Sequence, residues 1–489
     1  MVINTESSSS VMYDAILSIA LENRDQIAIE FVTGEKVTYI ELIALVDKCA
    51  NALFFLDLKP GDVIAVILSN SIEYISLIIA CAKCGIAYVP LLENFNDDYK
   101  NKAISIVNPK VLVTDFTLPL IKVNIPIINI LSLFKNEEPF ISKNHDSYTG
   151  IFRLLWSSGS TGFPKIIIWR QDKLLFERLR WIRNINITKN DIVFCRHTLD
   201  VAHATDLHVF TSLLSGATLI MCEGKESTTD IIYNIQKFKA TVMSALPFHY
   251  KQYADCVTDT NIFSSMKKPF CGGTYVSSEL MNYLYTKTGL KIMQLYGSTD
   301  FGLAMVNLNP IHENDLSMLI LEGVDAYILP LTKDDNLIGE LILKSPFTSE
   351  GYLNNDISNA NTFIKGYYHT GDVARKENNG KYAILGRVSD VILTTIGPML
   401  SPDIDVLLSD NTNKCQVISY VDINKTAKNF LHIAIYQPNN NFPNQYIEKM
   451  ELTLKHWGIA YDIKFIDSIP RTPVGKIDKP KLFPLKEAI

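Results

Sequence analysis

The sequence has no basic block, no uninterrupted apolar run long enough for a membrane helix, and no signal-peptide pattern at its start. With a net charge of −6 and no clustered cations, it gives no electrostatic sign of nucleic-acid binding. The longest apolar stretch, around residues 74–90, is broken by Lys83 and Gly85 and predicts a buried helix followed by a strand. Residues 1–11 are polar and serine-rich, so we expect a cytoplasmic protein without a transmembrane segment.

Cysteine is also used sparingly, with eight residues scattered through the chain. Cys81 and Cys84 form a C-x-x-C pair inside an apolar, helix-like run, and no second pair or histidine cluster lies near them in the sequence. This pattern predicts reduced and mostly buried thiols, and it argues against a zinc site or a redox pair.

The length and the alternation of segments predict the fold class. A chain of 489 residues is too long for one core, and a composition that is 47% hydrophobic and 20% charged is typical of soluble globular proteins. Strand-like and helix-like segments alternate, which predicts layered α/β architecture with largely parallel sheet. The expected strands are 62–68, 86–91, 109–114, 152–156, 166–169, 216–221 and 240–245, and a helix is expected at 72–83.

The pattern changes in the second half of the chain. Short alternating strands at 318–343 predict a small antiparallel barrel or sheet. The last hundred residues predict an α+β unit with strands at 416–421 and 431–436 and a helix at 444–457. We place the domain boundary at the hinge-like segment 387–390, which gives domains of residues 1–388 and 389–489.

The most informative segment is the loop Ser157-Ser158-Gly159-Ser160-Thr161-Gly162-Phe163-Pro164-Lys165, which lies between two predicted strands. Such a loop can direct several backbone N–H groups, hydroxyls and one lysine at a single point, which suits a polyphosphate. Its spacing differs from that of the common phosphate-binding loop. Composition alone fits a flexible linker equally well.

Five further segments carry polar or glycine-rich motifs of defined spacing. They are Cys271-Gly272-Gly273-Thr274, Gln294-Leu295-Tyr296-Gly297-Ser298-Thr299-Asp300-Phe301-Gly302, Tyr368-His369-Thr370-Gly371-Asp372, Gly386-Arg387-Val388-Ser389-Asp390-Val391-Ile392, and Pro470-Arg471-Thr472-Pro473-Val474-Gly475-Lys476-Ile477-Asp478-Lys479. Each of them taken alone would be an ordinary turn or a solvated charge.

Together and in this order, the six segments resemble those of the acyl-adenylate-forming enzymes, which include acyl-CoA and aryl-CoA ligases, free-standing nonribosomal adenylation domains and luciferases. The resemblance extends from about Asp25 to Leu482. It implies a large N-terminal region of layered α/β subdomains with a small β-barrel, and a small mobile α+β C-terminal domain.

The resemblance also implies a reaction. The expected enzyme uses ATP and Mg²⁺ to convert a small carboxylic acid into an acyl-adenylate, releasing pyrophosphate, and then transfers the acyl group to a thiol. CoA is the expected acceptor. The alternative acceptor is the phosphopantetheine arm of a separate acyl carrier protein, which would be loaded with an aryl, acyl or amino acid.

Site residues follow from matching the motifs one by one. The resemblance assigns the β- and γ-phosphates to the loop residues Ser157, Ser158, Gly159, Ser160, Thr161, Gly162 and Lys165, and the adenine to Gly272, Gly273, Tyr296 and Gly297. It assigns the α-phosphate to Thr299, the ribose to Asp372, and either the ribose or a phosphate to Arg387. It assigns the substrate carboxylate and the α-phosphate to Lys476. Asp300 stands where the family usually has a glutamate, and we expect it to be the magnesium ligand.

The acid and the second step are less defined by the motifs. Counting back from Gly216 places His203 at the acyl-pocket position where amino-acid-activating relatives carry an aspartate, which favours an organic or aryl acid. A shift of the alignment would place Asp206 there instead. Alternatively, His203 has no role in the reaction and is a partly buried residue that packs at the start of a helix. Ser389 replaces the usual hinge aspartate or lysine, and the segment 392–398 lacks the lysine that is usual after the hinge.

The motif residues disfavour two other classes of function. One is an inactive, nucleotide-binding relative with a regulatory role, which the presence of Lys476, Asp372, Arg387 and Thr299 disfavours. The other is a hydrolase with Ser160 as nucleophile, which lacks both the G-x-S-x-G spacing and suggested histidine and acid partners.

Overall fold

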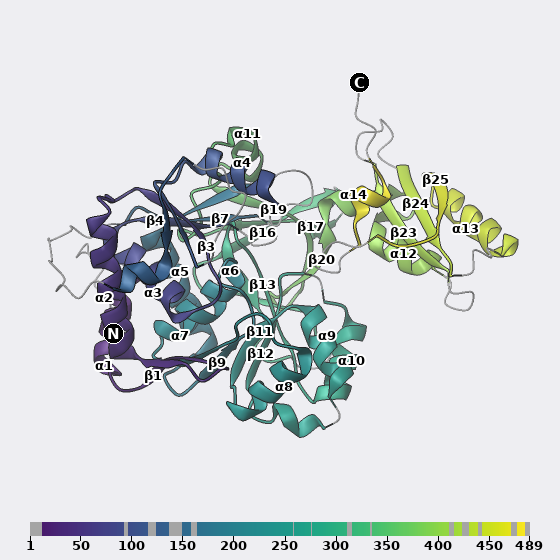
Figure 1. Cartoon of the computed structure of the whole chain (residues 1–489). Helices are drawn as coiled ribbons and strands as arrows, with labels where there is room; N and C mark the ends of the chain where they lie inside the picture. Colours follow the sequence, from purple (N-terminus) through teal and green to yellow (C-terminus); the bar gives the residue numbers. More distant parts are fainter. Residues whose placement is uncertain are drawn as a thin grey trace. The chain divides into compact units, whose positions relative to one another are not determined.

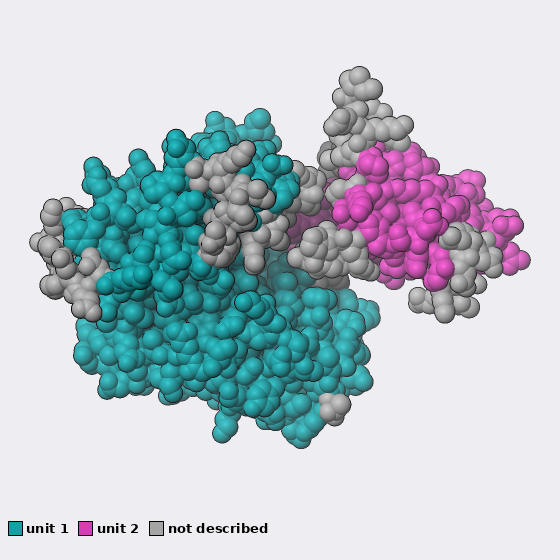
Figure 2. Space-filling model, viewed as in Figure 1, with its two compact units in different colours: residues 1–325, 343–368 teal, residues 326–342, 369–489 magenta. Residues whose placement is uncertain are grey.

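The computed structural model describes residues 12–91, 96–115, 124–135, 149–157, 164–257, 259–274, 276–310, 315–332, 335–409, 415–422, 430–438, 443–470 and 477–484. The chain divides into two compact units, residues 1–325 with 343–368 and residues 326–342 with 369–489 (Figure 2). The domain division at residues 388 and 389 stays a prediction. Within the described ranges, no helix has both the length and the apolar character needed to cross a bilayer.

Two sheets dominate the first unit (Figure 1). The six-stranded sheet has the order β6-β5-β3-β4-β7-β8 and is parallel except for the antiparallel pair β7 and β8. Its strands are β3 (Val63–Ile67), β4 (Ala87–Pro90), β5 (Val111–Thr114), β6 (Ile127–Asn129), β7 (Ile151–Trp156) and β8 (Ile166–Arg170).

The nine-stranded sheet has the order β15-β14-β13-β12-β11-β9-β10-β1-β2. Its central strands are parallel, whereas β2, β14 and β15 are antiparallel to their neighbours. Its strands are β1 (Ile27–Phe31), β2 (Lys36–Thr38), β9 (Ile192–Cys195), β10 (Thr218–Met221), β11 (Val242–Ala245), β12 (Lys268–Cys271), β13 (Met293–Ser298), β14 (Gly302–Val306) and β15 (Leu319–Ile320).

Helices connect these strands, as the alternating pattern predicts. They are α1 (Met12–Glu22), α2 (Tyr39–Phe55), α3 (Ile72–Cys84), α4 (Asp97–Val107), η1 (Ile130–Phe134), α5 (Gln171–Ile185), α6 (Ala202–Ala204), η2 (Thr205–Phe210), α7 (Thr211–Leu213), α8 (Thr228–Lys237), α9 (Pro247–Cys256), η3 (Thr260–Phe263), α10 (Ser278–Thr288) and α11 (Asp356–Thr362). Local sequence sets several of their starts, because Thr38 and Glu41 form a reciprocal capping box at α2 and Ser71 caps α3.

The parallel strands bury nearly continuous apolar runs because helices cover both faces of such sheets. One large core lies between β9–β13 and helices α8–α10, where Phe194, Met243, Tyr253 and Leu284 are almost completely buried. A second core lies beneath the six-stranded sheet and includes Ala65, Val89 and Leu154. These cores hold the ends of the parallel strands in fixed relative positions.

The remaining strands form smaller sheets. A five-stranded sheet has the order β16-β17-β19-β18 with β20 on β19, and its strands are β16 (Asp325–Thr332), β17 (Asp335–Lys344), β18 (Phe363–Ile364), β19 (Tyr367–Lys376) and β20 (Tyr382–Arg387). A two-stranded hairpin and a three-stranded sheet follow along the chain. Their elements, with the helices around them, are η4 (Val388–Asp390), β21 (Val391–Thr394), β22 (Gly397–Leu400), α12 (Ser401–Leu408), β23 (Gln416–Val421), β24 (Phe430–Tyr436), α13 (Asn444–His456), β25 (Ala460–Ile466) and α14 (Lys479–Leu482).

The predicted strands and helices agree with these elements to within a few residues at their ends. All eight cysteines are free thiols, and six of them are buried, which confirms the prediction made for the thiols. Cys81 lies fully buried in α3, where burial raises the pKa of its thiol well above the usual value.

Candidate active site at the carboxyl ends of the parallel strands

The carboxyl ends of β9, β11, β12 and β13 lie along one edge of the nine-stranded sheet, because these strands are parallel neighbours. Ligands of open α/β sheets bind outside this edge, in the loops that follow the strands. The predicted glycine pair follows β12 directly, and the predicted turn follows β13 directly. The predicted segment with His203 comes after β9 and a short loop.

The loop expected to hold phosphates connects β7 and β8, which pair as antiparallel neighbours. The backbone N–H of Ser157 donates to the carbonyl of Lys165 at 2.9 Å, and the Lys165 N–H donates to Ser157 Oγ at 3.0 Å. These bonds close the base of the loop. Residues 158–163, which include the predicted site residues Ser158, Gly159, Ser160, Thr161 and Gly162, lie outside the described residues.

The turn after β13 is held by bonds from other elements. The indole N–H of Trp169 donates to the Thr299 carbonyl at 2.8 Å, and the Thr348 hydroxyl donates to the Asp300 carbonyl at 3.2 Å. Gly297 has no room for a side chain, since a Cβ there would lie 2.9 Å from Leu303 Cα. The backbone of Thr299 and Asp300 is therefore fixed independently of any ligand.

Asp300 has an unusual environment for a carboxylate. Burial raises its pKa, while hydrogen bonding from Tyr352 and the charge of Lys165 oppose that rise. Its Oδ1 atom is buried and has no hydrogen-bond partner among the described residues. The Lys165 ammonium lies 4.5 Å from the centroid of the Tyr352 ring. The structure thus gathers the phosphate-loop lysine and the predicted metal ligand around Tyr352, a residue that sequence reasoning missed.

The glycine pair after β12 makes a close backbone approach. A Cβ on Gly272 would lie 2.6 Å from the carbonyl oxygen of Leu295, and a Cβ on Gly273 would lie 2.9 Å from Leu246 Cδ2. Gly273 also has φ +81°, which favours glycine. Tyr296 lies on β13, in the strand next to this pair, and is partly exposed. The protein residues that are predicted to contact adenine are therefore neighbours.

His203 lies in a helical segment that contains a π-helical turn, η2, a feature frequent at functional sites. Its Nε2 is 2.9 Å from Ser244 Oγ, at the end of β11. Its ring centroid is 4.2 Å from that of His197 and 5.7 Å from that of His208. Burial lowers the pKa of His203 to about 4, so its imidazole is neutral at pH 7.

Asp206 is committed to another partner. It forms a bidentate ion pair with Arg153, which is completely buried, with 2.7 Å between Arg153 Nη2 and Asp206 Oδ2. Burial by itself would raise the pKa of Asp206, but the charge and hydrogen bonds of Arg153 lower it below the usual value. A substrate amine would have to displace this pair, so the structure disfavours the alternative in which Asp206 binds an amine.

Sequence reasoning also missed the buried charges of α5. Glu177 Oε1 accepts from the Leu303 N–H at 2.9 Å, just after the Asp300 turn, and Glu177 also pairs with Arg178 and Arg180. Arg178 donates to the Asp206 carbonyl at 3.1 Å. Burial lowers the pKa of Arg180. One helix therefore supports both the Asp300 turn and the segment with His203. The only signal in the sequence was that charged residues of this helix stand among apolar residues that are also buried.

In the second unit, Asp372 and Arg387 are directly opposite each other on β19 and β20. Arg387 Nε is 2.9 Å from Asp372 Oδ1, and Arg387 is far more exposed than Asp372. The Asp372 N–H donates to Thr370 Oγ1 at 3.0 Å. Asp372 and Arg387, both predicted to contact the nucleotide, thus form an ion pair with each other.

Lys476 lies outside the described residues, as does the rest of 471–476. The residues that flank this segment are fixed: the Asp478 N–H donates to the Pro470 carbonyl at 2.9 Å, and Lys479 Nζ is 3.4 Å from Asp390 Oδ1. Ser389, at the predicted hinge position, lies in the short helix η4 beside Asp390.

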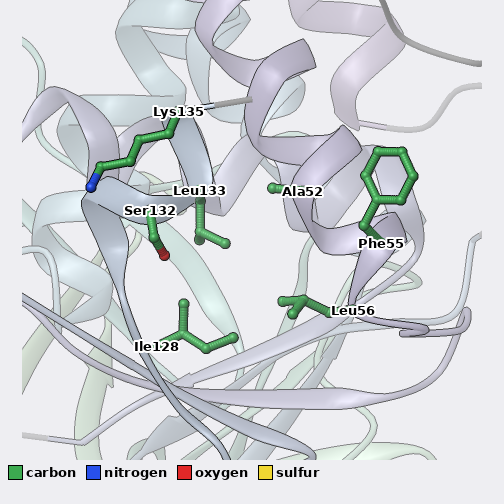
Figure 3. A pocket seen from close by; sticks show the side chains of 7 residues that line it. All are labelled: Ala52, Phe55, Leu56, Ile128, Ser132, Leu133 and Lys135. Atoms are coloured by element: carbon green, nitrogen blue, oxygen red, sulfur yellow. The ribbon is translucent and has the colours of Figure 1, made fainter. Parts of the chain in front are cut away.

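A shallow pocket elsewhere contains none of the predicted residues (Figure 3). Helix α2 and the segment β6–η1 form it, and Lys135 is its only charged residue. Its side chains are Ala52, Phe55, Leu56, Ile128, Ser132, Leu133 and Lys135. Its lining is mostly apolar and includes none of the motif residues, so the strand-end site remains the candidate.

The chain is similar to known proteins over most of its length. A family model described as AMP-binding enzyme matches residues 18–353. The 2-succinylbenzoate–CoA ligase of Oceanobacillus iheyensis is 24% identical over 384 residues, covering 76% of this chain and 78% of that protein. The feruloyl-CoA synthase of an Amycolatopsis species is 22% identical over 466 residues, covering 91% of this chain and 93% of that protein.

Solved structures show the same fold. MatB of Rhodopseudomonas palustris with bound ATP has a TM-score of 0.81 and 20% identity, covering 96% of this chain and 97% of its own. The o-succinylbenzoate CoA synthetase of Bacillus subtilis with ATP and a magnesium ion has a TM-score of 0.81 and 20% identity, covering 96% and 98%. The predicted fold class is confirmed.

Proposed function

This chain belongs to the AMP-binding enzyme family, and from this membership together with its site we propose that it is an AMP-forming acid–thiol ligase. It activates a carboxylic acid as an acyl-adenylate and transfers the acyl group to CoA. The observation that carries the proposal is the Asp300 turn, where a buried carboxylate with an unpartnered oxygen lies close to Lys165 beside the phosphate-loop hairpin.

In the first step, a carboxylate oxygen of the acid attacks the α-phosphorus of ATP. The bond between the α-phosphorus and the oxygen that bridges it to the β-phosphate breaks. Pyrophosphate leaves with that electron pair. The loop 157–165 holds the β- and γ-phosphates, Thr299 donates to the α-phosphate, and Lys476 neutralises the charge that develops between acid and phosphate. Hydrogen bonds to the Thr299 and Asp300 carbonyls fix the backbone that carries the Thr299 hydroxyl, which supports this role.

Magnesium fits Asp300. A carboxylate oxygen without a protein partner is the kind of ligand that this ion takes, with phosphate oxygens completing its shell. Within the described residues, no group of three or more histidine, cysteine, aspartate or glutamate side chains is placed to hold a metal ion. Magnesium commonly takes one or two carboxylates together with substrate phosphates and waters, which suits a site with Asp300. The ion would neutralise charge on the phosphates. A cation there also favours the ionised form of Asp300, against the rise that burial produces.

In the second step, the thiol sulfur attacks the acyl carbonyl carbon, the bond to the phosphate oxygen breaks, AMP leaves, and the thiol proton passes to solvent. Between the steps, the C-terminal domain is expected to rotate about Ser389, as the family resemblance implies. CoA is the proposed acceptor because the relatives named above are CoA ligases and synthases. A separate carrier protein with the same pantetheine thiol is the alternative.

The test is exchange of labelled pyrophosphate into ATP with a panel of fatty, aryl, dicarboxylic and amino acids. The expected result is exchange that depends on one class of acid and on Mg²⁺, followed by formation of the CoA thioester, identified by its mass. Thioester formation only with a phosphopantetheinylated carrier protein would replace CoA by the alternative acceptor. Absence of exchange with every acid, in folded protein that binds ATP, would refute the adenylation function.

A further inference from the structure

Four of the nine histidines of the chain gather in one cluster in the first unit. His197 follows β9, His203 and His208 lie on α6 and η2, and His249 lies in the first turn of α9. The centroid of the His197 ring is 4.2 Å from that of His203, 5.3 Å from that of His249 and 5.7 Å from that of His208. His208 is fully buried, whereas the other three are partly exposed.

Hydrogen bonds fix the orientation of these rings. His208 Nε2 accepts from the Ser244 N–H at 3.2 Å, so its Nδ1–H donates to the His203 carbonyl at 2.9 Å. His249 Nδ1 accepts from the Leu246 N–H at 3.4 Å, which leaves its Nε2–H as a donor without a partner among the described residues. His208 is therefore structural, and His249 presents a donor.

The cluster is electrically neutral. Burial lowers the pKa of His203 to about 4 and that of His208 and His249 to about 3. The charged groups that act on these rings are Arg196, at the end of β9, and Asp206, which Arg153 already neutralises. The remaining charge of the region is thus positive.

Arg196 retains donors that no described residue uses. Its Nη1 donates to Tyr253 Oη at 3.0 Å, and its guanidinium lies 5.7 Å from the centroid of that ring. Arg196 is partly exposed, and its charge lowers the pKa of both His197 and His249. A fixed cation therefore lies beside imidazole donors, in an arrangement that suits an anion.

The cluster adjoins the nucleotide side of the site. Leu246, whose N–H is bound by His249, also packs against Gly273, since a Cβ on Gly273 would lie 2.9 Å from its side chain. Ser244, on the same strand end, contacts His203 and His208. A molecule held by its carboxylate at the nucleotide would therefore extend its far end towards the histidines.

We infer that the acid activated by this enzyme carries a second anionic group at its far end, most simply a second carboxylate, which Arg196 and His249 bind. An apolar chain would displace water from the guanidinium and imidazole donors. Those donors would then lose their hydrogen bonds to water and gain none from the substrate. An amine would meet the charge of Arg196 and find Asp206 already paired. The inference rests on the proposed function and names its substrate class.

The test uses acids matched in length that differ only at the far end: adipic, hexanoic and aminohexanoic acids, and terephthalic, toluic and aminomethylbenzoic acids. Pyrophosphate exchange is measured with each. The expected kcat/KM is higher for the dicarboxylic member by about tenfold or more in at least one set. Equal values, or a preference for the apolar or amino member, would overturn the inference while leaving adenylation intact. No exchange with any member would instead refute the function on which it rests.

Variants give a second, independent test. Arg196→Met should reduce the preference for the dicarboxylic acid about tenfold and change kcat/KM for the apolar acid by less than about threefold. The matched control is Arg183→Met, which removes an exposed arginine of α5 and should preserve the preference. If Arg196→Met does not fold, His249→Gln replaces it, with the same expected direction. A preference unchanged in the folded variant would overturn the assignment.

Discussion

Replacing Arg153 by methionine tests the ion pair that holds the helix with the π-helical turn. The guanidinium is completely buried on β7, binds Asp206 through both terminal nitrogens, and donates to Thr205 Oγ1 at 3.1 Å. Methionine fills much of the same space without the charge, so the variant leaves the Asp206 carboxylate buried without its main partner.

The expected loss is large because only one partner is removed. Breaking a buried pair in this way costs about 3–5 kcal/mol, whereas replacing both partners by neutral groups of similar volume is often nearly neutral. We therefore expect Arg153→Met to lower the free energy of unfolding by about 3–5 kcal/mol, and Arg153→Met/Asp206→Leu to recover most of that loss.

The loss should also depend on pH. In the wild type, Arg153 keeps the pKa of Asp206 below its usual value, so this carboxylate does not titrate between about pH 5 and pH 7.5. In the variant, we expect burial, the largest influence on this pKa, to outweigh the charge of Arg178 and the hydrogen bond of Thr205, which still lower it. The pKa then lies above its usual value, so the folded state binds a proton at a pH where the unfolded state has lost it. The destabilisation should therefore be smaller at pH 5 than at pH 7.5.

Urea unfolding followed by tryptophan fluorescence measures this loss. Three of the four tryptophans, Trp156, Trp169 and Trp181, lie in the first unit with the ion pair, while Trp457 lies in the second. A loss below about 1 kcal/mol, a double variant as unstable as the single one, or a loss independent of pH would each refute the reasoning.

Three further predictions concern the reaction and its pH range. Lys476→Ala should lower pyrophosphate exchange by about 10²–10³ while calorimetry finds nearly unchanged ATP affinity; exchange at the wild-type rate would remove this lysine from the mechanism. Tyr352→Phe should raise the pKa of Asp300 further and increase the Mg²⁺ concentration for half-maximal exchange about fivefold, and superimposable magnesium curves would contradict that role. The free energy of unfolding should fall as pH drops from about 6.5 towards 4, since the unfolded chain takes up protons that the buried imidazoles do not. His208→Gln should reduce this slope by up to about 1.4 kcal/mol per pH unit in urea titrations, and an unchanged slope would show that His208 does not contribute.

The sequence predicted the elements well where the signal is local. The apolar runs 152–156 and 166–169 became β7 and β8, and Thr38 with Glu41 began α2 as a capping box. Strand periodicity and helix capping depend on residues a few positions apart, so they are readable without knowledge of the fold.

The candidate site was predicted in part for the same reason. Gly272, Gly297 and Asp300 belong to short motifs, and the structure places them at the ends of β12 and β13. Tyr352 was missed because tertiary contacts bring its segment to Asp300: the bridge between Tyr352 and Ile167, and the hydrogen bond from Thr348 to the Asp300 carbonyl. No spacing in the sequence reports such a contact.

By itself, the sequence determined the family, the fold class and the residues expected to carry the chemistry, because these depend on short motifs and on local periodicity. Tertiary structure decided the environment of those residues. It paired Asp206 with Arg153, 53 positions away, and it brought His197, His203 and His249 together beside Arg196. Burial and charge depend on side chains distant in sequence, so the environment of these residues exists only in the folded chain.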